Sequence, residues 1–346
     1  GNLLPAMTQE KLDNQRDVVK NEKRQSENRP YAKSRQLLLE MMYPEGHPYR
    51  WTVIGSMDDL SAASIEDVSE FFRLYYAPNN ASLVVAGDID VDQAKEWIAK
   101  YFGPIEPGRP VDRWSDWIPV LDGERRAVAE DAVELPRLYM QWHSPGWYKA
   151  GDAEFDLLSS ILSSGKTSRL YQSLVYEQQI AQDVRASQAS RELGGVFAIR
   201  ATAAPGHNLD ELEAAIDAVL ETLLKKGVTQ DEVALALTGY EAGFFRGLQR
   251  IGGFGGVADR LNRYNAFTGD PGYLDEDLAL FRRADAKSVN DWMRKFIGLD
   301  NRAVLHIVPQ GTFAAAGEFP AVDGVPGSSG AVTFTPPTIQ QATLSN

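Results

Sequence analysis

The chain has 346 residues, of which 43% are hydrophobic and 24% charged, and it contains no cysteine. This composition is typical of globular domains, and it excludes disulfide bonds and thiolate chemistry. The net charge of −13 and the lack of a long basic run argue against a nucleic-acid partner. No run approaches the roughly 18–20 apolar residues that span a bilayer, so we expect no membrane span.

The sequence repeats itself at an offset of 221 residues, the separation between Thr8 and Thr229. The segment TQEKL that begins at Thr8 returns as TQDEV at Thr229, and four positions further downstream match at the same offset. Those downstream pairs are Val68 with Val289, Phe71 with Trp292, Tyr75 with Phe296, and Asn80 with Asn301. Matches in two separated places predict a duplicated domain.

In chain order, the first copy is expected to hold helices over residues 8–28, 31–42, 64–76 and 91–102, with a short buried strand over residues 81–87. Thr8 can cap the first helix, and Leu12, Val18 and Val19 give that helix an apolar stripe. Residues 43–55 are expected to form a loop, because proline and glycine interrupt them.

The second copy is expected to begin near Glu124 with extended chain over residues 127–143. The expected elements that follow are helices over 152–163 and 168–179, strands up to residue 204, helices over 209–226 and 230–250, further helices up to residue 296, and a strand over 303–308. Helices mixed with short strands predict an α+β fold, with helices packed on a mostly antiparallel sheet.

The repeat also predicts the domain boundaries. Residues 1–103 form the end of the first domain, 104–123 a linker, 124–311 the second domain, and 312–346 a linker to a further unit. One offset before Glu124 lies roughly a hundred residues upstream of Gly1, so we expect the chain to be part of a longer protein with a truncated first copy. The alternative is a naturally short, divergent first copy.

Glu22 is the candidate residue for metal chemistry. It follows helical spacing from Leu12 and Val19, and its counterpart at the 221-residue offset is Gly243. A carboxylate directed toward an apolar face needs a partner, for which a metal ion or an arginine is suitable.

The motifs around Glu22 resemble those of the M16 (pitrilysin/insulinase) metallopeptidases. The resemblance is carried by RDVVKNE at 16–22, NRPY at 28–31, YPEGHPY at 43–49, YAPNN at 76–80 and LVVAGD at 83–88. In the second copy, SRLY at 168–171 resembles the motif of the paired, non-catalytic domain of that family. The resemblance implies two homologous M16-type domains, the first of them truncated.

The resemblance also implies a zinc site. Members of this family bind Zn²⁺ through the two histidines of a His-x-x-Glu-His motif and a later glutamate, and Glu22 matches that glutamate. The glutamate of the motif itself acts as general base. Three protein ligands leave one position open on the metal, as a catalytic zinc site requires.

The remainder of that site is not found in this sequence. Its four histidines, His47, His143, His207 and His306, do not form a His-x-x-Glu-His motif. We therefore expect the motif upstream of Gly1, no catalytic or cofactor-binding residue within the chain, and no zinc bound to the chain by itself. His47 is expected to be a solvated loop histidine, and His143 a structural one.

Two glycine-containing segments need separate interpretations. The sequence GGFGG at 252–256 lacks the lysine and the spacing of a phosphate-binding loop, which favours a hinge or helix break. The sequence SGKT at 164–167 lacks the first glycine of a P-loop and coincides with the M16 loop before SRLY.

Two departures from the family pattern concern other residues. Some members carry a second glutamate seven residues before the zinc ligand, where this chain has Gln15. Some also carry an arginine and a tyrosine that hold the substrate, and the matching places here are Val175 and Gln182. That pair would have to come from a further domain or a partner chain.

The resemblance implies a zinc-dependent endopeptidase of peptides or unfolded segments, inactive as this chain alone. Its expected partners are a peptide substrate and a second M16 half, in the same protein or in a partner subunit. The alternative is a non-catalytic M16 homologue that binds peptides or assists assembly. Bacterial relatives of this type are often exported, so a periplasmic location is preferred.

Overall fold

The structure, a computed structural model, describes residues 6–312. Within these residues the first copy (residues 6–103) consists of helices alone. They are α1 (Gln9–Glu27), α2 (Lys33–Met42), α3 (Met57–Ala62), α4 (Ile65–Tyr75), the short 3-10 helix η2 (Pro78–Asn80) and α5 (Val91–Phe102). Residues 104–123, which we call the strap, contain neither helix nor strand.

The second copy (residues 124–312) mixes strands and helices. Its elements are β1 (Arg125–Asp131), β2 (Arg137–Ser144), α6 (Asp152–Ser163), the π-helix η3 (Tyr171–Glu177), β3 (Ala181–Ala189), β4 (Gly195–Ala203), α7 (Leu209–Lys226), α8 (Gln230–Gly247), α9 (Val257–Thr268), α10 (Leu274–Arg283), α11 (Ala286–Phe296) and β5 (Ala303–Pro309). No helix among residues 6–312 is both long and apolar enough to cross a bilayer.

The five strands form one mixed sheet in the order β1-β5-β2-β4-β3. Only the pair β1 and β5 is parallel, with Arg125 opposite Ala303, whereas β2 runs antiparallel to both β5 and β4, and β3 antiparallel to β4. The expectation of helices on a mostly antiparallel sheet is therefore confirmed. Apart from His306, β5 is an apolar run, because it lies between two other strands and is covered on both faces.

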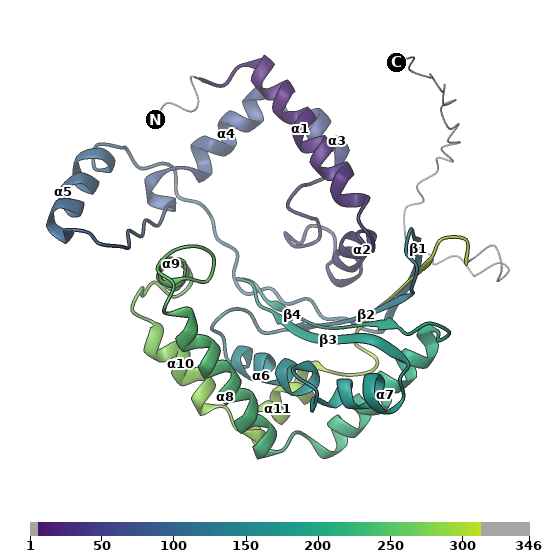
Figure 1. The fold of residues 1–346 in the computed structure, drawn as a ribbon. Helices are drawn as coiled ribbons and strands as arrows, with labels where there is room; N and C mark the ends of the chain where they lie inside the picture. Colours follow the sequence, from purple (N-terminus) through teal and green to yellow (C-terminus); the bar gives the residue numbers. More distant parts are fainter. Residues whose placement is uncertain (1–5, 313–346) are drawn as a thin grey trace, which may run out of the picture.

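One face of this sheet carries the main hydrophobic core. The helices α6, α7, α8 and α11 lie beneath that face (Figure 1). Trp142 and Leu138 of β2 pack there against Phe155 of α6 and Met293 of α11, and all four side chains are almost fully buried. The indole of Trp142 also donates a hydrogen bond to the carbonyl of Gly298 at 2.6 Å, so its one polar atom is satisfied.

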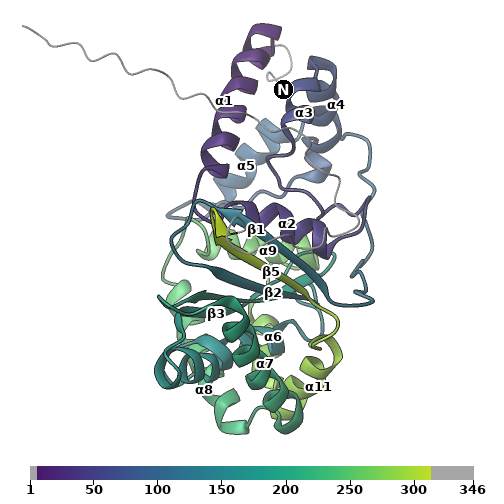
Figure 2. The ribbon, with the colours of Figure 1, turned by 90° about the vertical axis from the view of Figure 1, so that its right-hand side faces the viewer.

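The opposite face of the sheet is covered by the first copy, mainly through α2 (Figure 2). Leu38 of α2 packs on Leu305 and Ile307 of β5. Nearby, the phenol of Tyr31 donates a hydrogen bond to the carbonyl of Leu135 at 2.8 Å. The sheet is thus the middle of three layers, and it holds the two copies together.

The predicted repeat is present in the helices. α4 spans 65–75 and α11 spans 286–296, so both ends differ by the same 221 residues as the sequence motifs. α1 and α8 likewise begin after the equivalent caps Thr8 and Thr229, each of which accepts a hydrogen bond from the backbone N–H three residues later. Local capping chemistry therefore fixes the same helix starts in both copies.

The prediction of a strand over residues 81–87 is wrong. These residues form no strand, and Leu83 and Val85 are 55% and 48% exposed. Their counterparts Val304 and His306 lie in β5 between two neighbouring strands. A strand exists only where another strand accepts its backbone hydrogen bonds, and within residues 6–312 none lies beside this segment.

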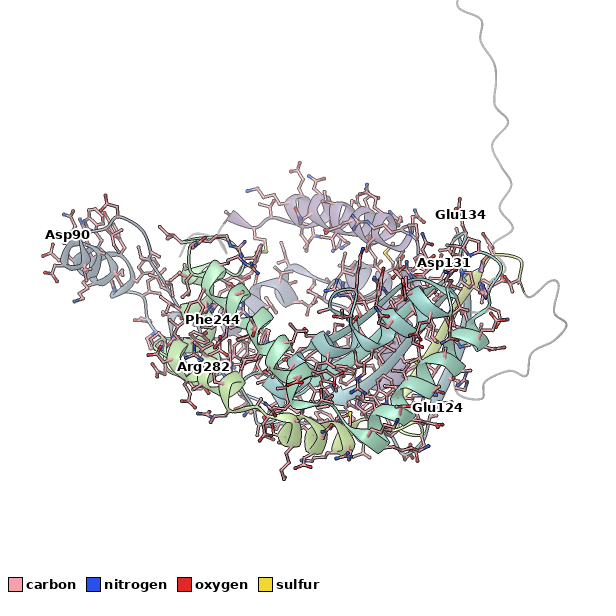
Figure 3. All side chains as sticks on the ribbon, turned by 60° about the horizontal axis from the view of Figure 1, so that its bottom comes forward. Asp90, Glu124, Asp131, Glu134, Phe244 and Arg282 are labelled. Atoms are coloured by element: carbon pink, nitrogen blue, oxygen red, sulfur yellow. The ribbon has the colours of Figure 1, made fainter. Side chains whose placement is uncertain are left out.

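The helix α5 is the most peripheral element of the first copy. It begins after Asp90 and projects away from the sheet (Figure 3). None of its residues is buried, and Trp97 and Tyr101 are 54% and 64% exposed. The first copy is therefore anchored through α2, while its other helices leave apolar side chains open.

A buried ionic network joins β5 to α7 in the second copy. Arg302, only 3% exposed, donates to both carboxylate oxygens of Asp217 and to Glu124. Glu213 accepts two hydrogen bonds from Arg126 and one contact from His306 at 2.9 Å. Burial opposes ionisation of Glu213, but the contacts with His306 and Arg126 outweigh it and lower its pKa to about 2.

Candidate functional site

Glu22 lies in the third quarter of α1, on a helix none of whose residues is buried. Its side chain is exposed, and it makes no hydrogen bond or ion pair within residues 6–312. The neighbouring charges are paired with other groups, since Lys23 bonds Glu27 at 2.8 Å and Arg24 bonds Asn21 at 2.8 Å. The expected burial of Glu22 against an apolar stripe is therefore absent, and its carboxylate is free to act as a ligand.

The counterpart position, Gly243, lies at the same place on α8 and is also exposed. A side chain added there would meet no atom within 4 Å, so packing does not require glycine at this position. The two copies thus offer equivalent exposed positions, one with a carboxylate and one without any donor.

The described residues do not by themselves fit a zinc site. Among residues 6–312 no group of three or more histidine, cysteine, aspartate or glutamate side chains is arranged to hold a metal ion. His47 and His143 lie at the junction between the copies, and His306 contacts Glu213 in the ionic network. His207 pairs with Glu211 at 3.0 Å, so none of the four histidines joins Glu22.

The interpretation of His47 as a solvated histidine is wrong. Its side chain is fully buried, because the loop after α2 folds back against the strap. Its Nε2 lies 3.1 Å from the carbonyl of Trp117, and its Nδ1 accepts the backbone N–H of Tyr49 at 3.0 Å. Proline and glycine around His47 suggested a solvated turn, but they do not reveal that another segment covers it.

The motif SRLY has a structural role in this chain. Arg169 forms a two-pronged hydrogen bond with Glu232, at 2.7 Å to each oxygen, and a third bond with the carbonyl of Gly227. The hydrogen bonds from Arg169 lower the pKa of Glu232 to about 2. Because Glu232 also belongs to the capping box with Thr229, Arg169 fixes the start of α8.

The GGFGG segment connects two helices. α8 ends at Gly247 and α9 begins at Val257, which confirms the helix break. Gly253 and Gly255 have φ angles of 76° and 75°, a region that favours glycine. Phe254 between them is 96% exposed.

A polar cleft follows the free edge of β3, and we call it the edge cleft. Its volume is about 520 Å³, and its lining comes from α6, β3 and β4. The residues of α6 that line it include Asp156, Ser159 and Ser163. The sequence predicts only a helix over residues 152–163, and its three serines are the one signal of a polar face.

Several polar atoms in the edge cleft form no hydrogen bond within residues 6–312. They are Asp183 Oδ1, Gln188 Oε1 and Arg200 Nε, although Asp183 Oδ1 lies 3.6 Å from Arg200 Nη2 in an ion pair. Burial, with the nearby carboxylates of Asp152 and Asp277, raises the pKa of Asp156 to about 8. Buried polar atoms without a hydrogen bond are costly, so a cleft that gathers them is suited to a polar ligand.

The backbone of β3 is open along the same edge. Ser163 bonds both the N–H and the C=O of Ala186, at 2.8 and 3.2 Å, so the backbone groups of Ala186 point away from β4. Strand alternation places the backbone groups of Val184 and Gln188 on the same outer edge. The edge cleft can therefore accept an extended peptide on either side of Ser163.

Comparisons with known proteins agree with this architecture. The family model described as "Peptidase M16 inactive domain" matches residues 62–240, more than half of the chain. The zinc protease PqqE of Helicobacter pylori is 31% identical over 221 residues, which cover 62% of this chain and 49% of that protein. The uncharacterized zinc protease ML0855 of Mycobacterium leprae is 23% identical and covers 68% of this chain and 53% of that protein.

Solved structures have the same fold. A protease from Helicobacter pylori superposes with a TM-score of 0.78 at 25% identity, over 88% of this chain and 73% of that chain. The periplasmic protease PqqL from Escherichia coli has a TM-score of 0.72 at 15% identity, over 90% of this chain and 36% of that chain. The chain spans about half the length of the curated relatives it matches. The family match over more than half of its residues establishes that the chain belongs to the M16 peptidase family.

Proposed function

We propose that the full protein is a zinc-dependent endopeptidase in which Glu22 is one of the zinc ligands. The observation that carries this proposal is the pair of equivalent positions on α1 and α8. The position on α1 holds a carboxylate that is exposed and has no partner within residues 6–312, and the position on α8 holds a glycine. The other zinc ligands and the general base come from residues outside this chain, because its 346 residues contain no His-x-x-Glu-His motif.

The exposed face of the first copy supports the same proposal. Phe71, Leu83 and Trp97 are each more than half exposed, whereas Trp292 and Val304, the counterparts of Phe71 and Leu83, are packed in the core of the second copy. We infer that residues outside this chain cover that face in the full protein and position α1. The second copy then has a structural role and supplies no catalytic residue.

The test is zinc content and peptide cleavage of the full-length protein. Glu22→Gln removes one anionic ligand while keeping the shape of the side chain, so bound zinc and cleavage of an unstructured peptide should both fall at least about 100-fold. Glu10→Gln, on the same helix, is the matched control and should change neither. Retained zinc and turnover in Glu22→Gln would exclude the proposed ligand.

A second measurement separates the whole protein from this chain. Purified as residues 1–346, the chain should bind no stoichiometric zinc and cleave no peptide, because one carboxylate cannot hold the metal. Stoichiometric zinc on this chain would contradict the assignment of the remaining ligands to residues outside it.

The second candidate function is peptide binding without catalysis, and the edge cleft favours it. An extended peptide can pair with the outer backbone groups of Val184 and Gln188 while its polar side chains meet Arg200 or Asp183. Val184→Pro removes one outward N–H and should weaken binding of a fluorescent unstructured peptide about tenfold. Val184→Ala trims the same side chain but keeps the N–H, so it should bind like the parent chain.

A further inference from the structure

Two histidines lie where the first copy meets the second. This junction, which we call the docking cluster, consists of Met42, Tyr43, His47, Leu121, His143, Val196 and Ala303, all of them buried. His47 belongs to the loop after α2, and His143 to the central strand β2. The rings of both histidines contact the ring of Tyr43, with centroids 4.6 and 5.3 Å away.

The hydrogen bonds of His47 require a neutral ring. Its Nδ1 accepts the backbone N–H of Tyr49, so Nδ1 carries a lone pair and no proton. Its Nε2 therefore bears the hydrogen and donates it to the carbonyl of Trp117 at 3.1 Å. A second proton on the ring would place two N–H groups against each other and break the bond to Tyr49.

His143 forms the other half of this contact. It is 7% exposed, and its Nε2 lies 2.9 Å from the carbonyl of Met42, the last residue of α2. This bond joins β2 of the second copy directly to the first copy. One neutral imidazole thus fixes the end of α2, and the other fixes the loop that follows it.

The charged side chains that the described contacts bring to the docking cluster are cationic. Arg125 of β1 donates to the carbonyl of Met41 at 2.7 Å, and Arg50 donates to the carbonyl of Tyr43. Arg191 lies over the ring of Tyr49 at 4.9 Å, and Lys295 of α11 lines the same cavity as His143. An imidazolium at His143 would be repelled by Arg125.

Two carboxylates, one in the strap and one in the β3–β4 loop, are engaged with other partners. Asp116 pairs with Lys149 at 3.4 Å, and Glu192 pairs with Arg113 at 3.6 Å. Among the described ion pairs, none brings a carboxylate to His47 or His143. A proton added to either ring would therefore have no carboxylate partner among the described ion pairs.

Burial lowers the pKa of His143 to about 4, and burial also lowers the pKa of His47. A histidine whose pKa is lower in the folded state than in the unfolded state stabilises the fold above its unfolded pKa of about 6.5. That contribution is lost as the pH falls from about 6.5 toward 4.

We propose that the docking cluster is an acid-sensitive clasp, which releases α2 and the loop 43–55 from the sheet in mildly acidic solution while the second copy stays folded. The separation is possible because the two copies bury different sets of residues. The core beneath the sheet contains neither histidine, whereas both take part in the contact above it. The clasp does not depend on zinc binding by Glu22.

The test is hydrogen–deuterium exchange of the whole chain at pH 7.5 and pH 5.0, corrected for the intrinsic effect of pH on exchange. Residues 42–50 should lose protection by on the order of tenfold or more at the lower pH, as linkage to a histidine titration predicts. Residues of β2 and β4 should keep theirs. Equal loss in both regions, or no loss in residues 42–50, would overturn the proposal.

Two variants separate the clasp from general acid unfolding. Gln at position 143 can still donate to the carbonyl of Met42 but does not titrate, so His143→Gln should reduce the acid-induced loss in residues 42–50 by at least about threefold. His207→Gln changes an exposed histidine and should exchange like the parent chain. An undiminished acid response in His143→Gln would show that this histidine does not control docking.

Discussion

The two copies share helix positions but differ in how those helices are packed. α11 buries Val289 and Met293 against the sheet, whereas α4, at the equivalent place, has no buried residue. Both helices begin with a capping box, formed by Ser64 and Asp67 in α4 and by Asp285 and Ser288 in α11. The comparison shows that capping and periodicity are sufficient to place a helix, while burial depends on whether a sheet lies beneath it.

The largest expected difference in stability is between two variants that place a charge at equivalent positions of the two copies. Leu305→Asp buries a carboxylate in the centre of the sheet, where Leu305 is 0% exposed, and should cost more than about 4 kcal/mol. Val84→Asp, its counterpart at the 221-residue offset, lies in a partly exposed segment without strand structure and should cost less than about 1 kcal/mol. Urea denaturation followed by circular dichroism measures both, and equal losses would mean that residues 81–87 are packed as tightly as β5.

The second comparison is between ion pairs. Arg302→Ala leaves Asp217 and Glu124 without their buried partner and should cost about 3–5 kcal/mol. Arg109→Ala removes the ion pair between the strap and Glu70 of the first copy, where the two side chains are 76% and 51% exposed, and should cost less than about 0.5 kcal/mol. Thermal unfolding checks both variants, and a loss below about 1 kcal/mol for Arg302→Ala would show that water screens the network.

The third comparison uses the same residue type in both copies. Val289→Ala removes two buried methyl groups and leaves a cavity, so it should cost about 2 kcal/mol. Val68→Ala at the equivalent place in α4 should cost less than about 1 kcal/mol, because Val68 is already partly exposed. If the two losses agree, the face of α4 is buried in solution.

The sequence was sufficient to predict elements whose signals are local. The helix predicted over residues 152–163 is α6 at the same bounds, and the helix break at GGFGG is present between α8 and α9. Residues 81–87 have the apolar composition of a strand, but their strand state depends on neighbours that composition does not encode. His47 was misjudged for the same reason, since its burial comes from Trp117, 70 residues away.

The candidate site was less accessible from sequence than the fold. Glu22 was selected because the repeat places a glycine opposite it, and its role as a zinc ligand stays a prediction. The sequence does not predict the edge cleft, because the cleft depends on the contact between Ser163 of α6 and Ala186 of β3. No sequence pattern joins these two segments. A polar helix face gives the same sequence signal whether it meets water or a strand edge.

The smallest expected effect compares two carboxylates, one in each copy. Asp156 has a folded pKa of about 8, well above its ordinary value of 3.8, so its ionised form destabilises the fold increasingly as the pH rises from about 4 to 8. Asp156→Asn removes that penalty, and because the side chain borders the open edge cleft, the gain at pH 8 should be only about 1–2 kcal/mol. At pH 4 the gain should vanish.

Glu22→Gln is the matched change in the first copy, where the carboxylate is exposed and has no partner within residues 6–312. It should alter stability by less than about 0.5 kcal/mol at either pH, since the substitution removes no contact of this exposed side chain in the described structure. Melting temperatures at pH 4 and pH 8 test both variants. A pH-independent gain in Asp156→Asn would trace its effect to packing, whereas a gain that grows with pH identifies Asp156 as a carboxyl group whose ionised form is destabilised by burial.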